Sequence, residues 1–307
     1  MLPFTLQQLR ILKAIATEKN FTKAASILYI SQPSLSKQIK SLERNLDTIL
    51  INRERNNISL TESGKVFLRY SDRILILCEE SCRALIDLKN GDRGNLRVGA
   101  SQTIGTYLMP KILTIFAQNY PQIDLKVQVN STRIIATSII KRKIDVAIVG
   151  GEISEELKKK LTIKPFVSDE LCLIIPRSHP FAIKKVITKE DLYYFDFITL
   201  HSNSTIKKFI DKTLLQNQIQ TNELRTILEL NSIEGIKTAV SLGLGVAFVS
   251  SSSIEKEIKL KQIKVLEIEN LNINRQLSII SNPECYKSKA FEFFYTELKR
   301  LKLKSTY

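Results

Sequence analysis

The chain has 307 residues, 43% of them hydrophobic, so it can form more than one domain with an apolar core, and disorder is not the leading interpretation. Its formal net charge of +15 favours an anionic partner, such as nucleic acid, an acidic surface or a charged metabolite. No apolar run approaches the roughly 18 residues of a membrane span, and the N-terminus lacks the apolar core of a signal peptide. We therefore expect no membrane partner.

The four cysteines do not indicate a disulfide framework in a chain of this length. Cys78 and Cys82 are one helical turn apart but have no histidine nearby to complete a zinc set. Cys172 and Cys285 are far apart in sequence, and nothing beside either thiol acidifies it, which leaves redox sensing as a minor alternative. We expect structural roles for all four cysteines and no metal site.

The first part of the chain predicts three helices. Apolar residues recur at helical spacing over residues 5–19. Thr22 is expected to cap a second helix, and either Ser31 or Gln32 a third. Pro33 then falls in the first turn of the third helix, where its missing N–H costs no hydrogen bond.

The third helix has two different faces. The expected buried face consists of Leu35, Ile39, Leu42 and Leu46, and the opposite face of Pro33, Ser36, Lys37, Lys40 and Arg44. Two helices joined by a short turn, the second basic on its exposed side, are typical of a helix-turn-helix whose second helix enters the major groove of DNA. On this pattern alone, a three-helix domain with a solvated basic face is the alternative.

The side chains of that face suit DNA chemically. Lys37, Lys40 and Arg44 can neutralise phosphates or reach guanine O6 and N7. Hydroxyl and amide groups can bond base edges, and a proline ring can lie against a thymine methyl. The candidate DNA-binding residues are Thr22, Lys23, Gln32, Pro33, Ser34, Ser36, Lys37, Lys40, Arg44, Arg53 and Arg55.

After the three helices, the sequence predicts a hairpin and a long helix. Two short strands flank the turn-prone pair Asn56 and Asn57, and this basic hairpin would form a wing that reaches the DNA backbone or minor groove. Thr61 is expected to cap a helix that continues to about Lys89. Its near-heptad stripe is Val66, Tyr70, Ile74, Leu77, Ser81, Leu85 and Leu88. The stripe suggests a partner helix, or packing against the chain's own domain.

From residue 96 the spacing of apolar residues changes. It predicts short strands that alternate with helices, which favours a mainly parallel α/β sheet. A glycine-containing linker is expected at 90–95. The chain is predicted to enter a second sheet around residues 165–169. A final strand and amphipathic helix could pack on either lobe.

Several motifs then carry a family resemblance. The segment TLQQLRILKAIATEKNFTKAASILYISQPSLSKQIKSLERNL, with LTESG further on, resembles the winged helix-turn-helix of the LysR-type transcriptional regulators. GNLRVGAS, FAQNYPQIDLKV, KIDVAIVG and LGLGVAFVS resemble the family's effector domain. GASQTIGTYLMP, QVNSTR and DVAIVGG are most similar to the subgroup that regulates RuBisCO operons, including members encoded in algal plastid genomes. The family usually has Gly in place of Asp47 and Phe in place of Ile51, which leaves the angle of the wing open.

The resemblance implies an α+β multidomain fold. It consists of an N-terminal winged helix-turn-helix at 1–61, a linker and dimerisation helix at 62–90, and an effector domain at 91–307. That domain is expected to be a two-lobed α/β structure like the periplasmic binding proteins. Lobe 1 would span about 96–164 and part of 267–307, and lobe 2 about 165–266.

Polar turns predict where an effector binds. Residues 101–103 follow the first strand, 131–132 follow a later one, and 201–204 precede another helix. Helix N-termini at the carboxyl ends of strands favour carboxylate or phosphate, although each such residue taken singly is a normal helix cap. The candidate effector-binding residues are Ser101, Gln102, Thr103, Ser131, Thr132, His201, Ser202 and Ser204, and Arg133 could add charge. No cofactor is expected. The resemblance implies a phosphorylated or carboxylated metabolite, or a nicotinamide nucleotide, as effector.

The expected function is a sequence-specific DNA-binding regulator of RuBisCO and carbon-fixation genes. A regulator of another metabolic operon, or a two-lobed binding protein or enzyme that does not read DNA sequence, is the alternative. Only two histidines are present, with no HExxH, P-loop or G-x-S-x-G motif, so we expect no enzyme. Expected partners are a palindromic promoter in double-stranded DNA, further copies of the chain as a homodimer or homotetramer, and RNA polymerase. The preference for Lys over Arg and Ile over Val suits an AT-rich genome, so the compartment would be a plastid stroma or a bacterial cytoplasm.

Overall fold

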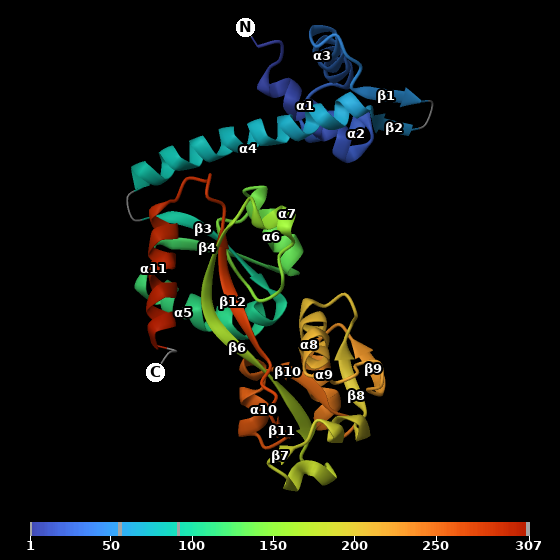
Figure 1. Ribbon diagram of the computed structural model, residues 1–307. Coiled ribbons are helices and arrows are strands. Elements are labelled where there is room, and N and C mark those ends of the chain that lie inside the picture. Colours follow the sequence, from blue (N-terminus) through green and yellow to red (C-terminus); the bar gives the residue numbers. More distant parts are fainter. Residues whose placement is uncertain (1, 55–56, 91–92, 305–307) are drawn as a thin grey trace. The chain divides into compact units, whose positions relative to one another are not determined.

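The computed structural model describes residues 2–54, 57–90 and 93–304. The chain divides into two compact units, Met1–Lys89 and Asn90–Tyr307 (Figure 1). No helix within the described residues is long and apolar enough to cross a membrane.

The N-terminal unit contains three short helices, a hairpin and a long helix. In chain order these are α1 (Leu6–Glu18), α2 (Phe21–Ile27), α3 (Gln32–Asn45), β1 (Ile51–Glu54), β2 (Asn57–Leu60) and α4 (Glu62–Asn90). The two strands pair antiparallel. Leu35, Ile39 and Leu42 of α3 are fully buried in a common core with α1 and α2, whereas Leu46 is only partly buried.

Side-chain caps begin these helices. Ser31 caps α3 by accepting a hydrogen bond from Ser34 N at 3.3 Å, and Thr61 caps α4 by accepting from Gly64 N at 2.9 Å. The prediction that Thr22 caps α2 was wrong. Asn20 does so, because its amide oxygen accepts from Lys23 N at 2.9 Å and its backbone is extended, so the helix already begins at Phe21.

The effector unit is built on an 8-stranded sheet in the described residues. Its strands are β3 (Gly94–Ser101), β4 (Ile123–Asn130), β5 (Val146–Val149), β6 (Thr162–Pro176), β7 (Val186–Ile187), β10 (Ala247–Ser250), β11 (Ile263–Ile268) and β12 (Asn274–Ser281). They follow the order β4-β3-β5-β12-β6-β11-β7, with β10 also paired to β6. A separate small sheet pairs β8 (Phe197–Leu200) with β9 (Thr226–Leu230).

The prediction of a mainly parallel sheet was wrong because the large sheet is mixed, although β11 is parallel to β7 and, in the small sheet, β8 is parallel to β9. β3 is parallel to β4 and β5, but β12 is antiparallel to both β5 and β6, and β6 is antiparallel to β10 and β11. The cause is that β6 runs unbroken for 15 residues and β12 returns beside it (Figure 1). The chain therefore passes between the lobes within one strand, since residues 162–170 of β6 pair with β12 in lobe 1 and residues 171–176 pair with β10 and β11 in lobe 2.

Helices cover the sheet in each lobe. Lobe 1 carries η1 (Ile104–Leu108), α5 (Met109–Asn119), α6 (Thr132–Ile140), α7 (Glu155–Lys158) and α11 (Lys289–Lys304). Lobe 2 carries α8 (Thr205–Gln216), α9 (Ile233–Ser241) and α10 (Glu255–Lys259), with the short turns η2 (Pro180–Ile183), η3 (Glu190–Tyr194) and η4 (Ser251–Ser253). The C-terminal strand and helix belong to lobe 1, because Leu277, Phe291 and Phe294 are buried in one core with Leu96 and Phe116.

Candidate DNA interface and effector cavity

The recognition face of α3 is solvent-exposed in the N-terminal unit. The side chains of Gln32, Pro33, Lys37, Lys40 and Arg44 are exposed, as are Thr22 and Lys23 in the first turn of α2, while Ser34 and Ser36 are half-buried. The buried residues Leu35, Ile39 and Leu42 hold the opposite side of the helix in the core. The faces of α3 are therefore divided as an amphipathic helix requires, with its cations free to meet an anionic partner.

The hairpin is tied to the end of α3 by Glu43. Its Oε1 accepts hydrogen bonds from Leu50 N at 3.0 Å and Ile51 N at 3.1 Å. Its Oε2 lies 3.3 Å from Nη2 of Arg53, and the Arg53 guanidinium lies over the ring of Phe21 at 5.3 Å. Arg53 is thus engaged within the unit. Arg55 lies outside the described residues, so its contact with DNA stays a prediction.

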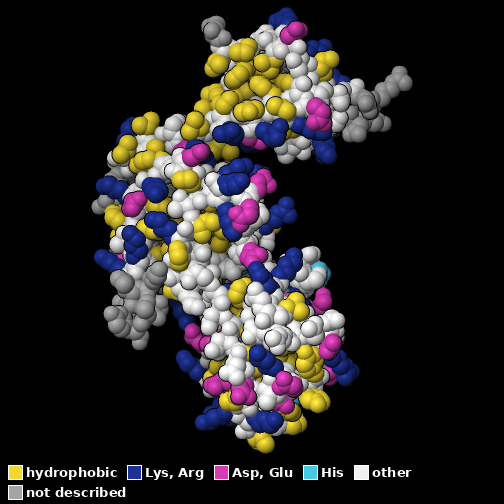
Figure 2. Space-filling view, in the orientation of Figure 1, with side chains coloured by type: hydrophobic (Ala, Val, Ile, Leu, Met, Phe, Trp, Pro, Cys, Tyr) yellow, Lys and Arg dark blue, Asp and Glu magenta, His cyan; other side chains and the backbone are white. Residues whose placement is uncertain are grey.

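An apolar stripe follows the long helix α4. Val66, Tyr70, Leu77, Leu85 and Leu88 are exposed, at 43 to 69% of their surface. Figure 2 shows hydrophobic side chains gathered on one face of this unit, and Lys and Arg side chains spread over both units. Exposed apolar side chains that follow one another along a helix are typical of a surface that packs against a partner.

A cavity of about 280 Å³ lies between the two lobes of the effector unit. Lobe 1 contributes Ser101, Gln102, Thr103, Thr106, Tyr107, Val129, Ser131 and Thr132. Lobe 2 contributes Leu200, Asn203, Ser204, Thr205, Ile206, Asn231, Ser232, Ile233 and Glu234, and Arg275 comes from β12. The residues that line the cavity thus lie between positions 101 and 275, a span of more than half the length of the chain.

Helix N-termini converge on this cavity from both lobes. Ser131 caps α6 and Ser232 caps α9 through their hydroxyl groups, Ser204 precedes α8, and a helical segment begins at Gln102. Each N-terminus presents free N–H groups and a positive partial charge, which favour an anion.

Buried polar atoms without partners lie in the cavity wall. Thr103 and Thr132 are 4% and 1% exposed, and within the described part of the chain neither Oγ1 has a hydrogen-bond partner. Arg275 is 3% exposed. Its Nε donates to Asp169 Oδ2 at 2.7 Å, and its Nη2 forms an ion pair with the same oxygen at 2.7 Å. Buried hydroxyl groups without partners, as in Thr103 and Thr132, are rare and costly, and they mark a place for a polar ligand.

Two adjacent glycines let the backbone pack closely against these groups. A β-carbon on Gly151 would lie 2.6 Å from Thr205 Oγ1 and 2.7 Å from Thr132 Oγ1. A β-carbon on Gly150 would lie 3.2 Å from Arg275 Cζ. Neither glycine has a positive φ, so these positions require glycine for space rather than for backbone conformation. The hydroxyl groups of Thr132 and Thr205 therefore meet at one point, although they come from different lobes.

Arg275 is held in place by a buried network. Asp169 accepts from Arg275 Nε and, through Oδ1, from Ser250 Oγ at 2.5 Å. Asp169 is 7% exposed and Ser250 1%. Because one buried carboxylate fixes one edge of the guanidinium, the remaining N–H groups keep a constant direction at the cavity.

The predicted effector residues divide into two groups. Ser101, Gln102, Thr103, Ser131, Thr132 and Ser204 line the cavity. The described residues His201 and Ser202 are not among its lining residues; His201 Nδ1 instead accepts from Asn203 N at 3.3 Å and shapes the turn before α8. Arg133 is exposed and also lies outside the lining.

Sequence reasoning missed several lining residues, of which Arg275 is chemically the most important. The sequence did contain a signal for Arg275. The alternation of β12 puts Arg275 on the same side as the buried Leu277 and Ile279, and a charged residue on a buried face is unusual. Thr205, Tyr107 and Glu234 gave no such signal, since they lie on helices where polar residues are common.

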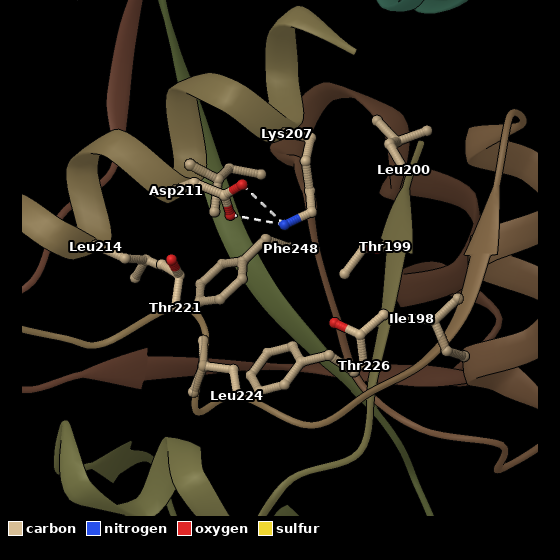
Figure 3. A pocket seen from close by; sticks show the side chains of 12 residues that line it. Ile198, Thr199, Leu200, Lys207, Asp211, Leu214, Thr221, Leu224, Thr226 and Phe248 are labelled. Atoms are coloured by element: carbon tan, nitrogen blue, oxygen red, sulfur yellow. Dashed lines mark hydrogen bonds and ion pairs between the residues drawn. The ribbon is translucent and has the colours of Figure 1, made fainter. Parts of the chain in front are cut away.

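A second, smaller cavity of about 30 Å³ lies inside lobe 2, between α8 and the β8–β9 sheet (Figure 3). Phe197, Leu214 and Phe248 line it, and Lys207 and Asp211, one turn apart on α8, form an ion pair at 2.8 Å in its wall. This space accommodates about one or two water molecules and no organic effector. The interlobe cavity is therefore the candidate effector site.

The combined features define a class of protein: a DNA-binding unit with a helix-turn-helix and hairpin, attached to a two-lobed ligand-binding domain. Comparison with known proteins gives the family. Residues 6–65 match the model of the bacterial regulatory helix-turn-helix proteins of the lysR family, and residues 89–302 match the LysR substrate binding domain. The chain belongs to the LysR family and is a LysR-type DNA-binding transcriptional regulator with an effector-binding domain. The predicted family and fold class are confirmed.

Named relatives cover nearly the whole chain. A protein of Phaeodactylum tricornutum is 74% identical over 302 residues, which are 98% of each chain, and one of Porphyra purpurea is 53% identical over 98% of this chain and 95% of its own. Both are named "Probable RuBisCO transcriptional regulator".

Solved structures show the same fold. Full-length CbnR in complex with its target DNA has a TM-score of 0.69 at 21% identity, covering 97% of this chain and 99% of that one. The regulatory domain of Synechocystis CcmR in complex with 2-PG has a TM-score of 0.61 at 26% identity, covering 68% of this chain and 98% of its own.

Proposed function

We propose that this chain controls transcription of RuBisCO genes by binding a promoter palindrome, and that a small anionic metabolite in the interlobe cavity modulates this activity. The target genes are supported by relatives of that name at up to 74% identity over 98% of the chain. The effector proposal depends on one observation: the hydroxyl groups of Thr132 and Thr205, one from each lobe, lie close together in the wall of the interlobe cavity.

The DNA contacts follow from the exposed face of α3. Gln32, Ser36 and Lys37 would meet base edges in the major groove, while Lys40 and Arg44 would contact phosphates. Pro33 would lie against a thymine methyl. Ser34 and the α2 residues Thr22 and Lys23 would contact the backbone.

A palindrome needs two recognition helices, and α4 supports the pairing of two copies. Its exposed apolar side chains would be buried between two such helices. Pairs of dimers would then associate through their effector domains into a tetramer that holds two half-sites. RNA polymerase is the further partner expected of a regulator that acts at a promoter.

The proposed domain bounds are 1–61 for DNA binding, 62–90 for dimerisation and 91–307 for the effector. Since the relatives come from algae, a plastid stroma is the proposed compartment. We propose no catalytic role.

The cavity suits a phosphorylated or carboxylated metabolite better than a nicotinamide dinucleotide. Its volume of about 280 Å³ lies just below the roughly 300–1,000 Å³ of pockets for drug-sized ligands. The orphan hydroxyl groups and Arg275 supply donors for one anionic group. Among neighbours of known structure, CcmR is bound to 2-PG and QuiR to shikimate.

An anion in contact with Thr132 and Thr205 would hold the two lobes together. Closure or rotation of the lobes would reposition the DNA-binding units of an oligomer and change the bend of the DNA. A useful regulator needs the effector to discriminate its two states by about 1–3 kcal/mol.

Footprinting of the full-length protein on promoter regions of its own genome, with the RuBisCO operon included, tests the proposal. We expect protection of a discrete palindrome that Lys37→Ala and Ser36→Ala both lose. Lys160→Ala removes an exposed lysine of the effector unit and serves as the matched control, with an unchanged footprint. Protection at another operon would reassign the target. Diffuse binding that salt weakens steeply and that the α3 variants do not change would contradict sequence-specific reading.

A further inference from the structure

The two lobes of the effector unit contact each other directly, through side chains of η1 and α5 in lobe 1. The hydroxyl group of Tyr107 in η1 donates to Glu234 Oε1 of α9 at 2.7 Å, and both residues line the cavity. Near the start of α5, Lys111 Nζ lies 2.6 Å from Glu255 Oε1 of α10. Each contact joins residues of different lobes, so neither persists when the lobes move apart.

Tyr107 makes a second contact with lobe 2 through its ring. Lys237 Nζ lies 4.9 Å from the ring centroid, within the range of a cation–π interaction. Lys237 is 2% exposed, donates to the Ser253 carbonyl at 2.7 Å and lies 2.9 Å from Glu257 Oε1. These contacts lie entirely within lobe 2 and do not depend on Tyr107. Lobe 2 therefore holds the ammonium group in the position that receives the ring.

The other side of the contact is fixed to the core of lobe 1. Ile104 and Met109, on either side of Tyr107 in the sequence, are buried in that core. Met109 N donates to the Ile104 carbonyl, five residues earlier, so this turn is π-helical, a rare geometry that is frequent at functional sites. Thr103, in the cavity wall, directly precedes the same turn. One helical segment thus carries both a group of the cavity wall and the contact with lobe 2.

The contacts between the lobes differ in strength. The Tyr107 hydroxyl group donates to a carboxylate, and charge-assisted hydrogen bonds are the stronger kind. The Lys111–Glu255 pair is more than half exposed, so solvent screens it. A further interlobe pair, Lys212 and Glu152 at 3.1 Å, is exposed in the same way. Tyr107 therefore contributes most to holding the lobes together.

We propose that four residues form an interlobe latch, which holds the lobes together before an effector binds and so sets the affinity for it: Tyr107, Lys111, Glu234 and Glu255. This inference rests on the proposed anion site of the cavity, which is formed by Thr103, Thr132, Thr205 and Arg275. Because Thr132 and Thr205 belong to different lobes, an anion bound against both stabilises the same closed arrangement as the latch. Two interactions that favour one state reinforce each other, so loss of the latch lowers effector affinity.

Crosslinking of the full-length protein with a zero-length carbodiimide tests the latch without any ligand. The reagent joins an amine to a carboxylate only where the two are in contact, so we expect it to link Lys111 to Glu255 in the absence of phosphate. Tyr107→Phe removes the interlobe hydrogen bond, while Glu234 keeps its contact with Lys237 at 3.0 Å. The yield of the crosslink should fall about twofold, because the lobes are apart for more of the time.

Two controls accompany the crosslinking. Tyr193→Phe makes the same chemical change at a hydroxyl group that accepts from Gln220 N within lobe 2, and it should leave the yield unchanged. The crosslink between Lys13 and Asp72, which lie 2.9 Å apart in the N-terminal unit, gives the reference yield for each sample. Mass spectrometry of tryptic peptides quantifies both crosslinks.

Calorimetry with inorganic phosphate measures the effect of the latch on the anion site. Tyr107→Phe should lower phosphate affinity about fivefold, the lower end of the usual coupling between sites, and Tyr193→Phe should not change it. Lys111→Glu and Glu255→Lys each bring two like charges together and should each lower the affinity about threefold. The double variant restores the pair with its charges exchanged and should recover the wild-type affinity. Simple attraction of phosphate by nearby charge has the opposite sign for Glu255→Lys, because a cation is added.

The outcomes separate this inference from the proposal beneath it. Absence of the Lys111–Glu255 crosslink in the wild-type protein, or an equal yield in Tyr107→Phe, would overturn the latch. Unchanged phosphate affinity in Tyr107→Phe, or a higher affinity in Glu255→Lys, would overturn its control of the effector site. If phosphate does not bind even the wild-type protein, the anion site is wrong, and the crosslink alone decides whether the latch exists.

Discussion

The hydroxyl oxygens of Thr132 and Thr205 both lie within 2.7 Å of the position that a β-carbon on Gly151 would occupy. Thr132 is the first residue of α6 in lobe 1, and Thr205 the first residue of α8 in lobe 2. A group bound in the interlobe cavity against these two hydroxyl groups contacts both lobes at once. Substitutions near the hydroxyl groups of Thr132 and Thr205 can therefore test whether a ligand closes the lobes.

Gly151→Ala is expected to block the anion site. The added methyl group would lie 2.6 to 2.7 Å from the two hydroxyl oxygens and would displace them, so phosphate affinity should fall at least about tenfold while DNA binding without effector is retained. Calorimetry with phosphate and footprinting without it measure the two properties. Gly235→Ala is the matched control, because a β-carbon there meets Leu230 at an ordinary 3.4 Å. Unchanged phosphate binding in Gly151→Ala would place the anion elsewhere.

Thr132→Val and Thr103→Val should separate stability from ligand binding. Because each hydroxyl group is buried and has no partner among the described residues, its replacement by a methyl group should leave stability equal or higher by about 1 kcal/mol. Phosphate affinity should nevertheless fall. Thermal unfolding of the unliganded protein and calorimetry give the two values. A clear loss of stability would show that the hydroxyl groups serve the fold instead.

Leu77→Glu on α4 is expected to weaken self-association. Leu77 is 57% exposed in the centre of the apolar stripe, and a carboxylate there would be buried without a partner if two stripes pack together. Light scattering coupled to size exclusion would then show smaller species. Glu79→Lys changes an exposed residue about 200° around the helix and should leave the oligomer intact. An unchanged oligomer in both variants would exclude α4 as the interface.

Asp47→Gly is expected to stabilise the N-terminal unit. Asp47 follows the end of α3 with φ 48°, a left-handed conformation that costs a residue with a β-carbon about 1 kcal/mol relative to glycine. The midpoint of thermal unfolding should rise. Ser26→Gly, at an exposed helical position of α2, should lower it. If both changes lower the midpoint, the side chain of Asp47 contributes a contact that outweighs the backbone cost.

Cys172 should be chemically inert in the native protein. Burial, with a smaller contribution from Glu170, raises the pKa of its thiol to about 12, so the reactive thiolate is almost absent at neutral pH. Iodoacetamide at pH 8 should label the exposed Cys82 and leave Cys172 unmodified until the protein unfolds, as peptide mass spectrometry can show. DNA binding by Cys172→Ser should be equal with and without oxidant. Rapid native labelling of Cys172 would revive a redox role.

The sequence was most informative where local hydrogen bonding decides the structure. The faces of α3, the caps Ser31 and Thr61, and the helix starts at residues 131 and 204 could be predicted because each depends on a few neighbouring residues. The placement of Thr22 as a cap failed for the same reason, since Asn20 is an equally good cap two residues earlier.

The tertiary structure alone decided which distant residues share the cavity. Arg275 lines the same cavity as Thr132 because β12 inserts antiparallel between β5 and β6, a pairing that local propensity does not encode. Glu234 and Tyr107 meet only when α9 of one lobe lies against η1 of the other. The sequence by itself therefore determined the helix-turn-helix and the family, and the packing of the lobes decided the chemistry of the effector site, because long-range strand pairing and burial depend on the whole chain.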